Sequence, residues 1–122
     1  MQNKFTLRAQ NALNTARELA SESGHTYIGS EHVLYGLASE SDSVAAKILE
    51  NRGASAKKIK EVILNYSGIG TKTNLNANDM TPRTKKIIES SFHEASAAYS
   101  HFIGTEHLLL SLLCEAECVG VK

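Results

Sequence analysis

Two glutamates, Glu31 and Glu106, stand at the same place in a stretch that the sequence contains twice. The stretch reads aromatic, Ile, Gly, hydroxyl residue, Glu, His and two apolar residues, first at 27–34 and again at 102–109. Each carboxylate could receive a guanidinium group through two parallel hydrogen bonds, or it could simply balance the positive end of a helix dipole. The residues alone leave both readings open.

Hydroxyl and imidazole side chains flank both glutamates. Ser30 and Thr105 directly precede them, where the hydroxyl of an N-cap accepts a hydrogen bond from the first turn of a helix. We therefore predict that both are N-caps, and that the glycine before each allows a tight turn. His32 and His107 follow the glutamates and could transfer protons. A histidine in the first turn is more often held by backbone groups and packing, so we favour a structural role.

The segments around these residues have the 3.6-residue apolar period of helices buried on one side, and no alternating strand pattern persists. Thr6 and the pair Thr81-Pro82 are predicted starts of two further helices. With an offset of 75 positions, Thr6 falls on Thr81 and Glu31 falls on Glu106. This internal duplication predicts an all-α helical bundle built from two tandem, pseudo-symmetric repeats.

We expect a single domain over residues 1–122. Repeat one spans 5–66 and contains four helices, the third ending at Gly53 and the fourth capped by Ser55 and closed by Gly68. Residues 67–79, rich in Gly and Asn, form the expected linker, and repeat two, 80–122, is incomplete because it stops inside its third helix.

The incomplete second repeat predicts an exposed apolar surface. In repeat one, the first two helices should be covered by apolar residues of the next two, which are Val44, Ala45, Ile48, Leu49, Ile59, Val62 and Ile63. Repeat two offers only Val119 and Val121 for this role, so part of its own stripe should lack cover. That stripe consists of Ile87, Ile88, Leu108, Leu109, Leu112 and Leu113. We expect self-association through the fifth and sixth helices, or a second repeat less stable than the first.

The overall composition excludes several classes of protein. Thirteen basic and thirteen acidic residues give a formal charge of zero, and the short basic runs at 57–60 and 83–86 are interpreted as solvated helix faces, so nucleic acid is not an expected partner. No apolar run approaches the roughly 20 residues that cross a membrane. The N-terminus does not resemble a secretory signal, and the two cysteines lie close together, so we expect a cytoplasmic protein.

Signatures of catalysis are missing, and we expect no catalytic residues. The sequence has no phosphate-binding loop, no Gly-x-Ser-x-Gly elbow and no His-Glu-x-x-His motif. Cys114 and Cys118 could combine with His101 or His107 in a metal or thiol site, but ligands this sparse rarely do, so we expect no metal. A small Cys/His metal-binding protein is the minor alternative.

The repeated motifs resemble the N-terminal domain of the Clp ATPases, most closely the ClpC type. The resemblance covers nearly the entire chain, and Ile-Gly-Ser/Thr-Glu-His favours ClpC over ClpA or ClpB. The motifs that carry it are Phe5-Thr6-x-Arg8-Ala9, Gly24-His25-x-x-Ile28-Gly29-Ser30-Glu31-His32-Val33-Leu34-x-Gly36-Leu37, Thr81-Pro82-Arg83-x-Lys85 and Ile103-Gly104-Thr105-Glu106-His107.

This resemblance implies a recognition domain of a chaperone system for protein quality control, proteolysis and stress response. Such a domain sits at the entrance of a protein-unfolding ring, receives adaptor proteins and unfolded substrates, and serves a ClpP-type peptidase. The resemblance further implies that Glu31 and Glu106 hold the guanidinium of phosphorylated arginine. The phosphate would meet helix N-termini and hydroxyls, for which the candidates are Thr6, Thr81, Ser30 and Thr105.

The sequence departs from the family in two respects. The second copy reads Tyr99-Ser100-His101 where the first reads Gly24-His25-Thr26, so we expect a loop of different shape. ATPase modules are missing, so we expect no cofactor here; ATP and Mg would belong to those modules. A structural or regulatory docking domain that binds adaptors only is the main alternative. It predicts no binding of phosphoarginine, whereas a metal or thiol enzyme predicts dependence on Cys114 or on an ion.

Overall fold

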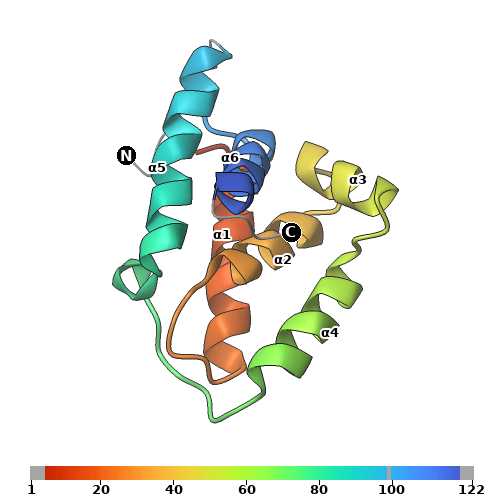
Figure 1. Cartoon of the computed structure of the whole chain (residues 1–122), viewed down its shortest axis with the longest axis vertical. Coiled ribbons are helices and arrows are strands. Elements are labelled where there is room, and N and C mark those ends of the chain that lie inside the picture. The colour runs from red at the N-terminus through yellow and green to blue at the C-terminus, as the bar shows by residue number, and fades with distance from the viewer. Residues whose placement is uncertain (1–4, 99, 119–122) are drawn as a thin grey trace.

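The computed structural model describes residues 5–98 and 100–118, without the side chains of 77 and 115–118. Within that part the protein is helical, as predicted, and no helix is both long and apolar enough to cross a bilayer. The elements are α1 (Leu7–Glu22), α2 (Ser30–Ser39), α3 (Val44–Asn51), α4 (Ala56–Ser67), the 3-10 turn η2 (Ala77–Asp79), α5 (Pro82–Ala97) and α6 (Thr105–Cys118) (Figure 1).

Side-chain caps start four of the helices. The hydroxyls of Thr6, Ser43, Ser55 and Thr81 accept hydrogen bonds from backbone N–H groups of α1, α3, α4 and α5, and Pro82 stands at the first turn of α5. The predicted caps Thr6, Ser55 and Thr81 are thereby confirmed.

The helices pack as two pairs, α1 with α2 and α5 with α6. On α1, four alanines are fully buried, namely Ala9, Ala12, Ala16 and Ala20. A Cβ at Gly36 on α2 would lie 2.0 Å from the Ala12 carbonyl oxygen, so only glycine permits this approach. At the equivalent crossing in repeat two, the Ser111 hydroxyl donates to the Ile87 carbonyl over 2.6 Å. The first pair is therefore closer at this point than the second.

Each repeat forms backbone hydrogen bonds with the residues that begin the other repeat. The Thr6 N–H donates to the Ile103 carbonyl over 2.9 Å, and the Thr81 N–H donates to the Ile28 carbonyl over 3.1 Å. Short parallel bridges join Phe5 to Ile103 and Ile28 to Met80. The loop of each repeat is thereby fixed beside the N-terminus of the first helix of the other repeat.

The segment predicted to link the repeats lies against the end of α1. The Gly70 N–H donates to the Ser23 carbonyl over 2.7 Å, and the Thr73 N–H donates to the Ser21 carbonyl over 2.9 Å. The Ser21 hydroxyl returns a hydrogen bond to the Thr73 carbonyl, and Leu75 packs against the core. These contacts fix the chain between α4 and η2 on the body of the molecule.

The predicted covering faces of α3 and α4 are partly wrong. Ala45 and Ile63 are buried, but Val44, Ile48 and Val62 are exposed. Apolar residues on these short helices cover more than one side, and period alone does not tell which side faces the core.

The prediction that apolar side chains of repeat two are exposed is also largely wrong. Ile87, Leu108, Leu109 and Leu112 are buried, and Leu113 is half exposed. Their cover comes from repeat one, because α1, α2 and α3 all pack on α6. The expected cover by Val119 and Val121 lies outside the described residues.

Candidate functional site

The reciprocal pairing of the repeats creates two equivalent junctions. We call one the Glu106 junction, which consists of Thr6, Gly104, Thr105 and Glu106, and the other the Glu31 junction, which consists of Thr81, Gly29, Ser30 and Glu31. Each combines the N-cap of one repeat with the glutamate loop of the other. The six predicted site residues are therefore divided into two sets of three and do not form one cluster.

Ser30 and Thr105 are not N-caps, contrary to the prediction. Each is the first residue of its helix, after a glycine at the cap position. The Gly29 N–H donates to Nδ1 of His32 over 2.8 Å, and the Gly104 N–H donates to Nδ1 of His107 over 2.9 Å. The imidazole reaches back from the first turn and satisfies this N–H, as Glu or Gln does in a capping box. The structural role predicted for the two histidines is thereby confirmed.

The glycines leave room for the glutamate side chains and do not form a tight turn. The backbone of Gly29 is extended, with φ −97° and ψ 173°, a conformation open to any residue. A Cβ at Gly29 or Gly104 would lie 2.5 Å from Oε1 of Glu31 or Glu106, respectively. Each carboxylate therefore folds back over the N-terminus of its own helix, where the dipole favours negative charge.

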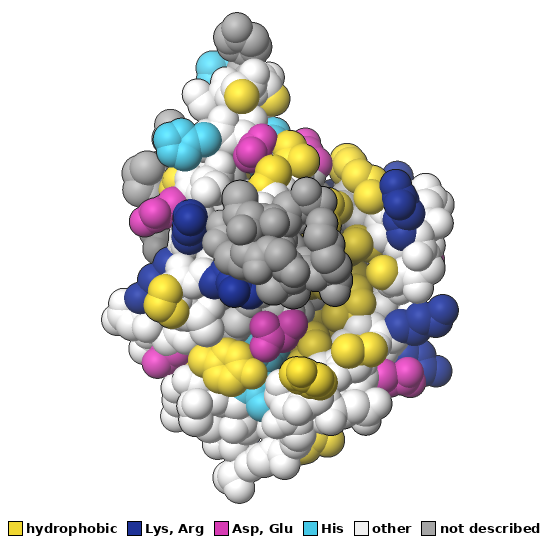
Figure 2. Space-filling model, in the orientation of Figure 1, with side chains coloured by type: hydrophobic (Ala, Val, Ile, Leu, Met, Phe, Trp, Pro, Cys, Tyr) yellow, Lys and Arg dark blue, Asp and Glu magenta, His cyan; other side chains and the backbone are white. Residues whose placement is uncertain are grey.

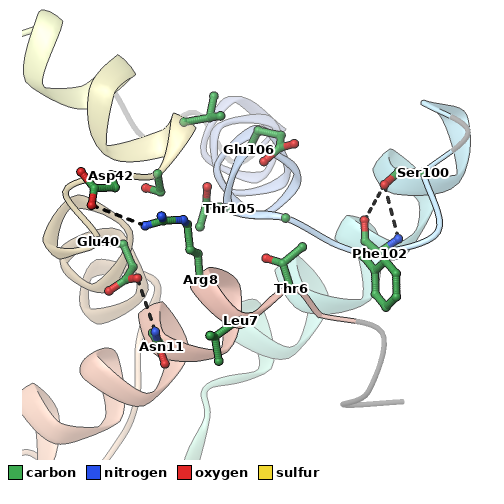
Figure 3. Close-up of a pocket in the computed structure, with 13 residues that line it drawn as sticks. Thr6, Leu7, Arg8, Asn11, Glu40, Asp42, Ser100, Phe102, Thr105 and Glu106 are labelled. Atoms are coloured by element: carbon green, nitrogen blue, oxygen red, sulfur yellow. Dashed lines mark hydrogen bonds and ion pairs between the residues drawn. The ribbon is translucent and has the colours of Figure 1, made fainter.

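A cavity of about 610 Å³ opens at the Glu106 junction (Figure 3). The N-termini of three helices face it, because Thr6 and Leu7 of α1, Ser43 and Val44 of α3, and Thr105 and Glu106 of α6 all line its wall. Backbone N–H groups at such ends attract anions.

Charged side chains of both signs complete the wall. The Arg8 guanidinium lies 4.0 Å from the Asp42 carboxylate, and the Asn11 amide donates to Glu40 over 3.5 Å (Figure 3). With Glu106, the cavity has three carboxylates and one guanidinium. It offers one region to an anion and another to a cation, which suits a ligand that carries both charges.

Thr105 connects two of the helices at this cavity. Its side chain is 3% exposed, and its hydroxyl accepts a hydrogen bond from the Ala45 N–H of α3 over 3.4 Å. The position of α6 is thereby coupled to the N-terminus of α3, although the two residues lie in different repeats.

The Glu31 junction is supported by a chain of hydrogen bonds through two buried histidines. Because Nδ1 of His32 accepts from Gly29, its Nε2 carries the proton and donates to Nδ1 of His25 over 2.8 Å. Nε2 of His25 then donates to the Gly68 carbonyl over 2.9 Å. Tyr27 stacks on His25 with ring centroids 5.9 Å apart. The chain connects the N-terminus of α2 to the end of α4.

His32 is the neutral imidazole in this chain. Burial lowers the pKa of His32 from 6.5 to about 4; the Glu31 carboxylate opposes this shift and His25 reinforces it. A second proton on His32 would also place an N–H against the Gly29 N–H, where no acceptor remains.

Sequence reasoning identified Thr6, Thr105 and Glu106 but missed the other side chains of the cavity. These are Leu7, Arg8, Asn11, Glu40, Asp42, Ser43, Val44, Ser100 and Phe102. One signal was available for Arg8, since Thr6-x-Arg8 recurs as Thr81-x-Arg83. No comparable signal marked Glu40 or Asp42, because their contacts with Asn11 and Arg8 join residues far apart in the sequence of repeat one.

Among the described side chains, no three His, Cys, Asp or Glu residues are placed so that they could hold a metal ion together. Cys114 is an exposed free thiol, and the side chain of Cys118 lies outside the described residues.

Comparison with known proteins agrees on the kind of domain. Residues 4–121 match the Clp repeat (R) N-terminal domain. Over 119 residues the chain is 40% identical to the protein named negative regulator of genetic competence ClpC/MecB of Bacillus subtilis and to the chaperone protein ClpB of Oceanobacillus iheyensis. The match covers 98% of this chain and 15% of each relative, so the chain spans a small part of their length.

Solved structures share the fold. The N-terminal domain of the chaperone ClpD from Arabidopsis thaliana superposes with a TM-score of 0.75 at 18% identity, covering 98% of this chain and 87% of that one. The N-domain of ClpV from Vibrio cholerae gives 0.72 at 20% identity, covering 94% of this chain and 69% of that one.

Proposed function

Because the chain belongs to the Clp repeat N-terminal domain family, we propose that it is a non-catalytic recognition domain whose two junctions bind phosphorylated arginine on substrate proteins. Glu31 and Glu106 receive the guanidinium, and the adjoining helix N-termini receive the phosphate. The domain acts in the cytoplasm as part of a Clp-type unfolding ATPase, where it presents tagged or unfolded substrates and adaptor proteins to the ring and, through it, to a ClpP-type peptidase.

One observation carries the proposal, namely that each glutamate lies where a helix of the other repeat begins. Thr6 caps α1 beside Glu106, and Thr81 caps α5 beside the Glu31 loop. A phosphoarginine side chain carries its phosphate directly on a nitrogen of the planar guanidinium cation. A carboxylate next to helix N-termini presents the two complementary charges side by side.

The wall of the Glu106 cavity supports the same assignment. Arg8 provides a cation for the phosphate when it leaves Asp42 and binds the phosphate instead. Leaving Asp42 costs little, because exposed ion pairs of this kind contribute little to stability. Asp42 and Glu40 leave negative charge around the guanidinium. The cavity therefore suits phosphoarginine better than phosphoserine, which lacks the cation.

Calorimetric titration with free phosphoarginine tests the proposal, with phosphoserine and arginine as controls. We expect two binding events in the wild type, one in Glu31→Ala and one in Glu106→Ala, because each substitution removes a charge-assisted contact of about 1.5–3 kcal/mol. The double variant should unfold at the same urea concentration as the wild type yet bind little.

Undiminished binding by the folded double variant would refute the assignment of the two glutamates. Absence of binding by the wild type, together with saturable binding of an adaptor, would favour a docking domain that binds adaptors only.

A further inference from the structure

The α3–α4 arm, residues 44–72, concentrates the positive charge of the chain. It contains six basic residues and two acidic ones, so its formal charge is +4, while the remaining seven basic and eleven acidic residues give −4. All six basic side chains are exposed, namely Lys47, Arg52, Lys57, Lys58, Lys60 and Lys72. Figure 2 shows Lys and Arg side chains along the edge formed by α3 and α4, with hydrophobic side chains beside them.

The outer side of α4 adds large apolar side chains to this charge. Val62 is 65% exposed, Tyr66 is 92% exposed, and Ile69, just beyond the helix, is 74% exposed. Lys58, Val62 and Tyr66 follow at intervals of four and therefore share one side of α4. We call Lys58, Val62, Tyr66 and Ile69 the arm face. Tyrosine within an apolar and charged surrounding is typical of the anchor residues of protein interfaces.

The Glu106 cavity has the complementary chemistry. Its rim carries the carboxylates of Glu40, Asp42 and Glu106, and exposed apolar side chains stand beside them. These are Leu7, Val44 and Phe102, which are 71%, 51% and 53% exposed. A cavity of about 610 Å³ has room for a tyrosine ring and the stem of a lysine.

The two surfaces cannot meet within one chain. The arm face lies at the C-terminal end of α1, where Gly70 bonds to Ser23, whereas the cavity is built on Thr6 and Leu7 at its N-terminal end. A helix of 16 residues separates them by roughly 24 Å. A second copy, however, supplies the missing partner to each surface.

We propose that the arm face of one protomer docks into the Glu106 cavity of another, with Tyr66 as the anchor and Lys58 facing the carboxylate rim. The contact is head-to-tail, so a pair retains a free cavity on one copy and a free arm face on the other, and association continues into chains or a closed ring. Docking and phosphoarginine binding exclude each other at this cavity, but the docking does not depend on whether phosphoarginine binds.

Other occupants explain the arm face less well. Nucleic acid or an anionic membrane would attract the lysines, yet the remaining −4 of the chain would repel either polyanion. Neither accounts for a cavity of opposite charge and similar apolar content on the same molecule.

Sedimentation from about 10 µM to 1 mM protein, at low and at 300 mM salt, tests the proposal. We expect reversible association that weakens with salt, because exposed charges are screened. Lys58→Glu combined with Tyr66→Ala should weaken it at least tenfold, and Glu40→Lys combined with Asp42→Lys should do the same. Lys85→Glu on α5, outside both surfaces, is the matched control and should leave it unchanged.

Mixing two charge-reversed proteins provides the decisive experiment. Lys58→Glu alone and the Glu40→Lys, Asp42→Lys protein should associate with each other more tightly than either does with itself, because the reversed surfaces are again complementary. A monomer at 1 mM in low salt, or association that none of the arm and cavity variants changes, would overturn the proposal. So would binding of the wild type, but not of Lys58→Glu, to phosphatidylglycerol vesicles or duplex DNA without self-association.

Discussion

The Glu31 and Glu106 junctions share a sequence motif but are held in place by different contacts. At Glu106, the N-terminus of α3 adds a third helix end and Thr105 accepts a hydrogen bond from Ala45. At Glu31, support comes from the His25–His32 chain, for which repeat two has Ser100 in place of His25. Equivalent site residues can therefore be positioned by different contacts, and these contacts decide how each junction responds to substitution and to pH.

Substitutions where the paired helices cross should give the largest difference in unfolding free energy between the two repeats. Gly36→Ala places a methyl group against the backbone carbonyl of Ala12, which cannot move aside, so we expect a loss of at least about 3 kcal/mol of unfolding free energy. At the equivalent position, Ser111→Ala removes one hydrogen bond and should cost about 1 kcal/mol. Urea denaturation measures both. Gly70→Ala, whose Cβ would have its nearest neighbour at 3.7 Å, is the control.

The histidine chain should make the stability of the first junction depend on pH. Below pH 6.5 the unfolded chain gains a proton on His32 that the folded chain does not take up until about pH 4. The corresponding stabilisation, about 3 kcal/mol, is complete above pH 6.5 and is lost as the pH falls to 4.

Urea titrations between pH 7.5 and 4 check this, with His32→Gln as the comparison. Glutamine can still accept the Gly29 N–H but does not titrate, so its unfolding free energy should fall less over that interval. Parallel pH profiles for the two proteins would contradict the role given to His32.

The two threonine caps should differ in strength. Thr6→Ala removes one cap hydrogen bond and should cost about 1 kcal/mol. Thr81→Ala should cost about 2 kcal/mol, because the Thr81 hydroxyl also pairs over 2.8 Å with the hydroxyl of Thr84, which is fully buried. Thermal midpoints of the two variants rank them, and equal midpoints would show that the hydroxyl pair adds nothing.

The smallest expected effect on stability is at the two glycines before the glutamates. Gly29→Ala and Gly104→Ala meet only the end of a flexible glutamate side chain, so each should lower the unfolding free energy by about 0.5–1 kcal/mol. Under the proposed function, phosphoarginine binding at the substituted junction should weaken by about 1 kcal/mol, since the carboxylate is displaced. Calorimetry together with denaturation separates the two effects, and unaltered affinity would show that the folded-back carboxylate is not the binding geometry.

Local signals predicted local features well. Thr6, Ser55 and Thr81 were identified as caps because a hydroxyl next to a helix start acts on its own turn. The same rule gave a wrong prediction for Ser30 and Thr105. The glycine before each is the cap residue, and a histidine three residues after that glycine accepts its N–H. Such competition between neighbouring residues is not visible in a pattern of residue types.

Contacts between the repeats were beyond prediction from the sequence. Duplication indicated that the halves fold alike, but not that each loop pairs with the opposite repeat or that α3 packs on α6. The buried state of Leu109 and Leu112, and the presence of Arg8 and Glu106 at one cavity, follow from that exchange. Periodicity describes one helix at a time and carries no information about which neighbour covers it.

The bond between Thr6 and Ile103 has a consequence for biosynthesis. Its two partners lie near opposite ends of the described chain, so the N-terminus of α1 gains its backbone partner only after nearly the whole domain has left the ribosome. Until then α1 and α2 can pair, but the Glu106 junction does not exist. A nascent or truncated chain that ends before Ile103 therefore cannot form this cavity, and the junction is completed only after the loop of the second repeat has emerged.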